Sequence, residues 1–264
     1  MNNELLNHLM ARKTTYRSKH LAKTGERPER IMRPPIDPLI QQEYLEGKVL
    51  LIDKPLHWTS FDVVRKLRGM LQIKKIGHAG TLDPLATGLL IVCTGKFTKK
   101  INEYMAQEKE YTGSFTLGAV TPTYDLESEP EQMKDFSFVT DELLHNTTKQ
   151  FIGEIDQIPP IFSAIKKEGV ALYELARRGD AVDLQPRKII ISSFEITEVQ
   201  LPAVKFRVVC STGTYIRSLA HDFGASLGCG AYLSSLCRTR IGEFKLNEAV
   251  GMDEFESKLY GDTV

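Results

Sequence analysis

The spacing of hydrophobic and polar residues changes several times along the chain, and each spacing predicts a different element. The apolar runs at 49–52 and 89–93 are short and bounded by turn residues, which is typical of buried strands. Between them, apolar residues recur at helical spacing over 63–71, after a Thr-Ser pair that can cap the start of a helix. Residues 109–118 alternate between apolar and polar positions like a strand with one buried face.

The second half of the chain continues this mixture of strands and helices. Residues 187–200 and 203–211 alternate as two strands separated by a Leu-Pro pair, which predicts a hairpin. A short helix is expected over 141–152, and a longer one over 215–227 with Thr214 as its N-cap. Because strands and helices follow one another in no fixed order, the pattern predicts an α+β fold, a mixed sheet with flanking helices.

Composition divides the chain into three parts. Residues 1–45 are basic, poor in large apolar residues and interrupted by prolines, so we expect a flexible N-terminal extension. Residues 46–250 carry the periodic pattern and form the expected folded domain, while 251–264 are expected to be a short C-terminal tail. Three interpretations of the extension are open. It is a basic arm that contacts a nucleic acid, it is a disordered leader, or Met32 is the true start.

Charge is balanced in total and uneven along the sequence. The chain has 34 basic and 34 acidic residues, which argues against a simple polyanion-binding protein. Residues 1–35 nevertheless carry a net charge of +5 and residues 205–245 one of +4, while residues 120–160 carry −7. Local basic surface is what a phosphate backbone would meet, but charge alone favours solvated faces.

The cysteines, the N-terminus and the apolar runs narrow the class of protein. The four cysteines show no C-x-x-C spacing, so neither a disulfide framework nor a zinc site is expected. The first residues lack the pattern of a signal peptide, and no apolar run reaches the ~20 residues that span a bilayer. We therefore expect a protein of the reducing cytoplasm with neither a membrane nor a metal partner.

The stretch at 77–90, G-H-A-G-T-L-D-P-L-A-T-G-L-L, is the strongest candidate for chemistry. Its glycines predict a shaped loop, and the proline after Asp83 keeps that residue out of the helical region. A single carboxylate on a stiff turn before a buried strand is a typical place for a catalytic group. The alternatives are a turn-only role for Asp83 and a structural role for His78.

This string resembles the signature of the TruB-type tRNA pseudouridine synthases, and further motifs resemble the same family. They are K-P-L-H-W-T-S at 54–60, Q-I-P-P-I-F-S-A-I-K at 157–166, C-S-T-G-T-Y-I-R at 210–217 and A-Y-L-S-S-L-C-R-T-R-I-G-E-F at 231–244. The resemblance covers about residues 47–244. It implies the pseudouridine synthase fold, with a mixed, mostly antiparallel sheet and a central RNA-binding cleft. Many relatives carry a C-terminal RNA-binding domain of the PUA type, which is not expected here.

The resemblance assigns catalytic roles to three residues. Asp83 is implied to be the essential carboxylate, as nucleophile or as base, and Tyr111 to pack against the target base and assist proton transfer. Arg217 is implied to pair with Asp83. The residues themselves favour a specific partner for Arg217, because the helix dipole disfavours a cation in the first turn of a helix. His57 stands where the family has glycine, so a left-handed backbone would be costly there.

Other residues are assigned to binding. The resemblance implies that His78 helps to hold the displaced nucleotide, that Leu236 lines the uracil pocket and that Lys54 supports the active-site loop. Tyr215 is a further expected substrate-binding residue. Contacts to RNA are expected from Lys166, Lys167, Arg177, Arg178 and Arg238. The alternative for several of these five is a solvated charged surface.

The implied reaction converts a uridine to pseudouridine in the T-arm loop of tRNA, at position 55 in tRNA numbering, after the base is flipped out. It requires no cofactor and no metal. The expected partner is tRNA, with no obligatory protein partner, and we expect a monomer. Two alternatives are a synthase that acts on another RNA and a tRNA-binding folding chaperone. The joint presence of Asp83, Tyr111 and Arg217 disfavours a purely non-catalytic binder.

Overall fold

The computed structural model describes residues 35–163, 166–167, 170–172, 178 and 184–261. The strands are β1 (Val49–Lys54), β2 (Ile76–His78), β3 (Ala86–Thr94), β4 (Lys109–Leu117), β5 (Gly153–Gln157), β6 (Lys166–Lys167), β7 (Val170–Ala171), β8 (Arg187–Gln200), β9 (Ala203–Cys210), β10 (Ala231–Ile241) and β11 (Phe244–Lys245). The α-helices are α2 (Pro38–Glu46), α3 (Ser60–Leu71), α4 (Ile101–Ala106), α5 (Asp141–Thr148), α7 (Ile216–Leu227) and α8 (Met252–Tyr260). Short 3-10 turns are η1 (Gly95–Lys100), η2 (Lys149–Phe151) and η3 (Leu246–Glu248). Within these described ranges, no helix is long and apolar enough to cross a bilayer.

One mixed sheet runs through the molecule in the strand order β1-β3-β10-β4-β9-β8-β5, with β2 added to β3 and β11 added to β10. Strands β3 and β10 are parallel, and all the other neighbours in this sheet are antiparallel. The expected α+β architecture with a mixed, mostly antiparallel sheet is therefore confirmed. The expected hairpin is also confirmed, as β8 and β9.

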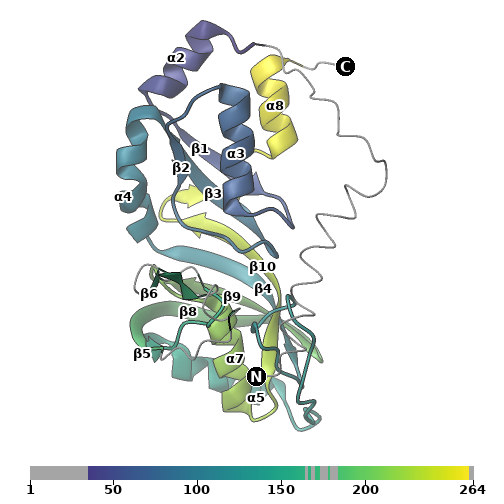
Figure 1. Ribbon diagram of the computed structural model, residues 1–264. Helices are drawn as coiled ribbons and strands as arrows, with labels where there is room; N and C mark the ends of the chain where they lie inside the picture. Colours follow the sequence, from purple (N-terminus) through teal and green to yellow (C-terminus); the bar gives the residue numbers. More distant parts are fainter. Residues whose placement is uncertain (1–34, 164–165, 168–169, 173–177, 179–183, 262–264) are drawn as a thin grey trace.

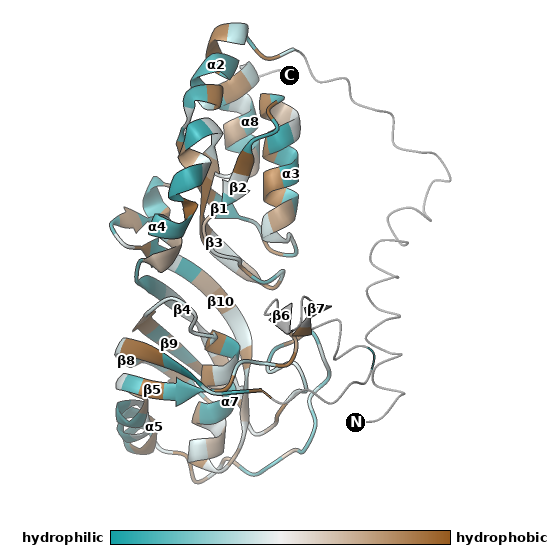
Figure 2. Ribbon diagram, turned by 60° about the vertical axis from the view of Figure 1, so that its left-hand side comes forward, coloured by the Kyte–Doolittle hydropathy of each residue, from teal (hydrophilic) through white to brown (hydrophobic). Residues whose placement is uncertain are grey.

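The helices gather at two ends of this sheet. Figures 1 and 2 show α2, α3, α4 and α8 around β1, β2 and β3, and α5 and α7 beside β5, β8 and β9 at the opposite end. The long strands β4 and β10 connect the two groups, since β10 pairs with both β3 and β4. Residues that belong to different ends of the sequence consequently meet at the middle of the sheet.

Two segments that were expected outside the folded domain contribute regular structure to it. Residues after 251 form helix α8, in which Met252 and Phe255 are buried against α3 and β3. Helix α2 begins at Pro38 after Asp37, whose carboxylate caps it, and Ile36 is buried in the same apolar cluster. The boundaries expected at 45 and 251 are therefore corrected, because Ile36 and helix α8 complete the core. Residues 1–34 of the expected extension lie outside the described residues.

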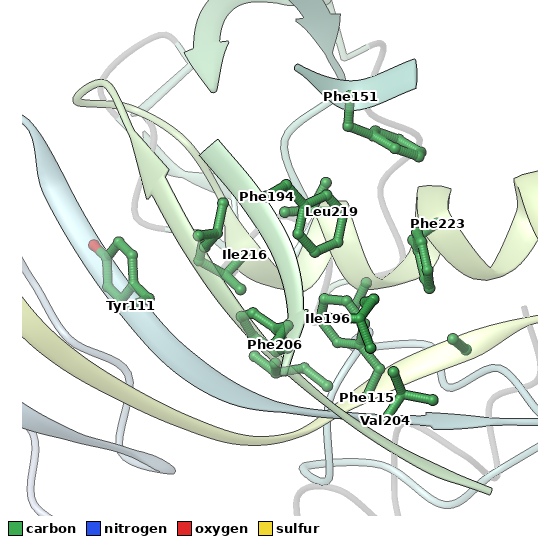
Figure 3. Close-up of a cluster of buried hydrophobic side chains, with 14 of the residues drawn as sticks. Tyr111, Phe115, Phe151, Phe194, Ile196, Val204, Phe206, Ile216, Leu219 and Phe223 are labelled. Carbon is green, nitrogen blue, oxygen red and sulfur yellow. The ribbon is translucent and has the colours of Figure 1, made fainter. Parts of the chain in front are cut away.

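The larger core lies under α7 and is rich in aromatic side chains. Phe115, Phe194, Phe206 and Phe223 pack within it, and the rings of Phe115 and Phe206 are stacked 4.1 Å apart. Figure 3 shows Tyr111 at the edge of this cluster, with its hydroxyl directed away from the phenylalanines. The sequence alternation of β4 thus produces an apolar face that ends in a polar group.

Local signals explain where the two principal helices begin. Thr59 caps α3 as expected, and the capping box is completed by the carboxylate of Asp62. The expected cap of α7 is wrong. Tyr215 occupies the N-cap position, while the hydroxyl of Thr214 donates to the carbonyl of Ser211 at 3.0 Å. Gly228 ends α7 in the left-handed conformation, which glycine adopts freely.

Gly88 allows the parallel strands β3 and β10 to approach each other. It pairs with Arg238 and has φ +97°. A Cβ atom at this position would lie 2.4 Å from the carbonyl oxygen of Arg238, so no larger residue fits. This close pairing brings the end of the loop that contains Asp83 beside residues 236–238 of β10.

Candidate active site

Asp83 and Arg217 form the predicted ion pair. Arg217 lies in the first turn of α7, and its Nε is 2.9 Å from Oδ2 of Asp83. The side chain of Arg217 is 7% exposed and that of Asp83 is 42% exposed. The arginine is therefore fixed inside the protein, while the carboxylate it holds remains accessible to a ligand.

The guanidinium of Arg217 is satisfied on all sides by groups from distant segments. Its Nη1 donates to the carbonyl of Thr123 at 3.3 Å, and its Nη2 donates to the carbonyl of Phe162 at 3.1 Å. Its Nε also lies 3.7 Å from Oδ2 of Asp125. Burial alone would lower the pKa of Arg217, but the charges of Asp83 and Asp125 raise it above its ordinary value. Arg217 is consequently a permanent cation in this site.

Asp125 is a second carboxylate that sequence reasoning missed. It lies between the strand predicted at 109–118 and the helix predicted at 141–152, outside the motifs that resemble the family. Oδ1 of Asp125 accepts hydrogen bonds from the hydroxyl of Thr123 at 2.6 Å and from the amide of Glu127 at 2.9 Å. Burial raises the pKa of Asp125 to about 6, against the opposing effect of Arg217. The available signal was the threonine two residues earlier, since a hydroxyl there can hold a buried carboxylate.

The loop that carries Asp83 is attached to the start of α3. The amide of His57 donates to the carbonyl of Pro84 at 2.8 Å, and the hydroxyl of Ser60 binds both the amide and the carbonyl of Leu82. His57 has φ +67°, so it does adopt the left-handed conformation that its glycine-like position suggested. The loop is thus fixed on both sides of Asp83.

Arg238 supports this loop from inside the protein. It is 1% exposed, and its Nε and Nη2 donate to the carbonyls of Leu89 at 2.8 Å and Gly80 at 3.1 Å. Its predicted contact with an RNA phosphate is therefore wrong, because the guanidinium is buried and bonded to backbone carbonyls. The motif placed the residue correctly, but the sequence did not reveal which way it faces.

Lys54 is likewise buried. It is 0% exposed, and its Nζ donates to the carbonyls of Pro55 at 3.0 Å and Trp58 at 2.6 Å. Burial lowers its pKa to about 8. The expectation of a substrate contact is corrected, and the expected support for the active-site loop agrees with these bonds.

A pocket of about 500 Å³ opens over Asp83. This volume lies within the range of about 300–1,000 Å³ that is typical of small-ligand sites. Six of the predicted residues line it: Asp83, Tyr111, Tyr215, Arg217, Leu236 and Arg238. Burial raises the pKa of Tyr111, so its phenol is neutral, and it shares a hydrogen bond with Arg238. The pocket therefore combines the carboxylates of Asp83, Asp125 and Glu127 with aromatic and aliphatic side chains.

The other predicted binding residues lie elsewhere. His78 is half-buried in β2 and is not among the residues that line the pocket. Lys166 and Lys167 form β6, and Arg178 is exposed, whereas Arg177 lies outside the described residues. Their roles toward RNA stay predictions. In the part of the chain that the structure covers, no group of three His, Cys, Asp or Glu residues could hold a metal ion.

Comparisons with known proteins give a consistent assignment. Residues 68–216 match the family model described as TruB family pseudouridylate synthase (N terminal domain). Residues 217–263 match the tRNA pseudouridylate synthase B C-terminal domain. The chain is 57% identical to a tRNA pseudouridine synthase B from Flavobacterium johnsoniae, over 83% of this chain and 98% of that protein. It is 48% identical to one from Parabacteroides distasonis, over 84% of this chain and 97% of that protein.

A solved structure supports the fold as well. The chain resembles a protein in the crystal structure of a Cbf5-Nop10-Gar1 complex, with a TM-score of 0.65 and 31% identity. The match covers 85% of this chain and 56% of the other, so the present chain spans little more than half of that protein. The expected pseudouridine synthase fold is confirmed. Together with the geometry of the pocket, the family matches show that this chain belongs to the TruB family of pseudouridylate synthases.

Proposed function

We propose that this protein converts a uridine in the T-arm loop of tRNA, at position 55 in tRNA numbering, to pseudouridine. The observation that carries the proposal is the accessible carboxylate of Asp83, held 2.9 Å from the buried Arg217 at the base of a pocket. The pocket volume of about 500 Å³ suits a ligand of the size of a nucleoside, and relatives that are 57% and 48% identical bear the name tRNA pseudouridine synthase B.

The chemistry is an isomerisation within one nucleotide. The bond between C1′ and N1 breaks, the uracil turns in the pocket, and a bond forms between C1′ and C5. The proton on C5 leaves and N1 gains a proton, so the composition of the nucleotide does not change. Asp83 acts at the ribose, by attack on C1′ or by removal of a ribose proton. A deuterium isotope effect at C2′ is expected only for the second route.

Arg217 holds the carboxylate of Asp83 in a fixed orientation. An ionised acceptor in a charge-assisted hydrogen bond has a fixed direction, and the exposed part of the carboxylate then points to the ligand. The three further contacts of Arg217, to Thr123, Phe162 and Asp125, prevent it from following Asp83 when a ligand binds. Preorganised charge of this kind is a large term in enzymatic rate enhancement.

The walls of the pocket suit a detached uracil. The neutral ring of Tyr111 offers a face for stacking, and Leu236 supplies an apolar side. A base inside an RNA loop must leave its stack to reach this depth, which costs a few kcal/mol. Aromatic stacking in the pocket compensates for part of that cost.

The test uses the purified protein and an unmodified tRNA transcript. We expect pseudouridine at position 55, detected by carbodiimide modification and primer extension, and none in a transcript with cytidine at that position. A transcript of the isolated T arm should also react. Modification at another position, or of other RNAs in preference, would support a synthase of different specificity. Tight binding without any pseudouridine would contradict the proposal.

A further inference from the structure

A pair of stacked aromatic rings lies on the two segments that carry Asp125 and Arg217. The ring of Tyr124 stacks on the imidazole of His221, with centroids 4.0 Å apart and planes 18° apart. Neither residue lines the pocket. Tyr124 precedes Asp125 in the chain, and His221 lies on α7, the helix that carries Arg217. The stack therefore joins the two elements whose acidic and basic groups meet at the site.

The backbone of Tyr124 is strained. Its φ is +64°, a left-handed conformation that costs a bulky residue about 1–2 kcal/mol. Such strain persists only when the surrounding structure determines it. The amide of Tyr124 donates to the carbonyl of Thr121 at 3.1 Å, and its carbonyl accepts from the amide of Leu233 at 2.9 Å. Glycine would satisfy the same backbone bonds without strain, so the side chain must contribute something that the backbone does not.

The position of His221 on α7 shows what the ring contributes. Residues four apart on a helix lie on one face, and His221 follows Arg217 by four. Asp125 and Arg217 are 3.7 Å apart between Oδ2 and Nε, so a small shift of the loop would separate them beyond ion-pair distance. The stack clamps the loop to α7 one turn along the helix from this contact.

The polar atoms of the two rings play little part in the contact. Nδ1 of His221 is buried and has no hydrogen-bond partner among the described residues. Burial, and then the charge of Lys134, lower the pKa of His221, so the imidazole is neutral. Burial, and then the charge of Asp222, raise the pKa of Tyr124, so its phenol is neutral too. Two neutral rings stack without a charge penalty, and the faces of the rings carry the interaction.

We propose that the stacked pair of Tyr124 and His221 places Asp125 against Arg217, which makes both aromatic residues positioning residues for the reaction. This inference rests on the proposed function, because the cation that Asp125 restrains is the one that orients Asp83. The rings touch neither substrate nor reacting atoms. They act by fixing the loop at 121–128 on α7.

The experiment compares variants that keep or remove a ring. Tyr124→Gly accepts the left-handed backbone but loses the stack, and His221→Ala loses it from the other side. We expect kcat to fall about tenfold to a hundredfold in each, the range for a catalytic group misplaced by ~1 Å. KM should change less than kcat, since neither side chain lines the pocket. Tyr124→Phe and His221→Phe keep two stacked rings and should retain most of the wild-type kcat.

A merely structural role predicts a different pattern. If the pair only stabilised the fold, Tyr124→Gly would change the melting temperature and leave kcat unchanged in the folded protein, which would overturn the proposal. A matched control is Tyr44→Leu, which removes one ring of the Tyr44 and Phe255 pair at the other end of the sheet. This variant should affect stability alone.

A second measurement does not depend on turnover. Amide hydrogen exchange of residues 121–128 should become faster in Tyr124→Gly and stay at the wild-type rate in Tyr124→Phe. If the wild-type protein makes no pseudouridine, the proposed function fails, but faster exchange would still support the clamp. Unchanged exchange together with unchanged kcat in Tyr124→Gly would overturn the positioning role.

Discussion

Two groups of buried charges lie around the same pocket and are neutralised in different ways. In the carboxylate group, Arg217 is shared between Asp83 and Asp125. In the carbonyl group, Lys54, Lys109 and Arg238 donate to backbone carbonyls, and no carboxylate among the described residues lies within 4.0 Å of their charged nitrogens. The first group holds a reactive side chain, and the second holds main-chain segments near the pocket.

The hydrogen-bond partner of a buried cation indicates its role in the protein. A carboxylate paired with a buried arginine can remain accessible to a ligand, as Asp83 does. A carbonyl bonded to a buried cation fixes main-chain position and offers no chemistry. Both Arg217 and Arg238 border the pocket, so residue type and location alone do not separate them. The two arginines differ in their partners, because Arg217 pairs with the carboxylate of Asp83 and Arg238 bonds to the carbonyls of Leu89 and Gly80.

Replacement of Asp83 should have the largest effect. Asp83→Asn removes the accessible charge while it keeps the size of the side chain, and we expect kcat to fall about 10⁴-fold or more, as for loss of an essential nucleophile or base. Single-turnover assays on a tRNA transcript measure this. Asp53→Asn is a matched control, because Asp53 is an exposed acid on the neighbouring strand β1. Comparable turnover by Asp83→Asn would place the chemistry elsewhere.

Replacement of Arg217 should reduce activity by a smaller factor. Arg217→Met removes the group that orients Asp83, and we expect kcat to fall about 10²- to 10³-fold, as for loss of a preorganised charge. Arg217→Lys keeps the charge without the planar fork and should recover only part of this loss. Affinity for tRNA, measured by filter binding, should change little. A loss confined to affinity would show that Arg217 binds RNA instead.

Replacement of Arg238, which bonds to backbone carbonyls, should lower the stability of the fold. Arg238→Met leaves the carbonyls of Leu89 and Gly80 without a donor, and we expect the free energy of unfolding to fall by about 2–4 kcal/mol. Urea denaturation measures this. Arg240→Met is the control, since the partly exposed ion pair of Arg240 with Glu108 contributes less than about 1 kcal/mol. Unchanged stability in Arg238→Met would show that these two hydrogen bonds do not hold the loop in place.

The sequence predicted more of the fold than of the site. The periodic runs located β1, β3, β4, β8 and β9, because the alternation of apolar residues depends only on which face is buried. The pairing of Asp83 with Arg217 also followed, since the resemblance and the unfavourable dipole position of the arginine both indicated it. These features are determined locally, or by motifs that are nearly complete in this chain.

The directions of side chains and the long-range partners could not be predicted. Arg238 lies on a strand, where one residue of register decides between the inner and outer face, and the motif does not state the register against β3 and β4. Asp125 joins the site because its loop forms a bridge with Leu233 of β10, a contact between segments that are far apart in the sequence. The sequence pattern did not predict helix α8, because its apolar residues are few and are buried only by tertiary contacts in the folded core.

The pH dependence of activity should separate the two carboxylates. Burial raises the pKa of Asp125 to about 6, so this group takes up a proton below pH 6 and its attraction for Arg217 weakens. We expect kcat/KM to fall about tenfold for each pH unit below 6 if the ionised form of Asp125 is required. Asp125→Asn should remove this step and lower the plateau above pH 6. A profile of Asp125→Asn that keeps the step would assign it to another group.

The smallest expected effect concerns His57, at the junction between the carbonyl group and the loop of Asp83. Its φ of +67° requires a left-handed backbone, and its amide holds the carbonyl of Pro84. His57→Gly removes a conformational cost of about 1 kcal/mol in the folded protein. Glycine also raises the conformational entropy of the unfolded chain, which costs a similar amount on folding, so the free energy of unfolding should change by less than about 1 kcal/mol. His57→Val cannot adopt this backbone without greater strain, because a branched side chain is a genuine outlier there. We therefore expect His57→Val to lower both the melting temperature and kcat, and His57→Gly to preserve both. If the valine variant matched the glycine variant, the bond from residue 57 to Pro84 would not be what fixes the catalytic loop.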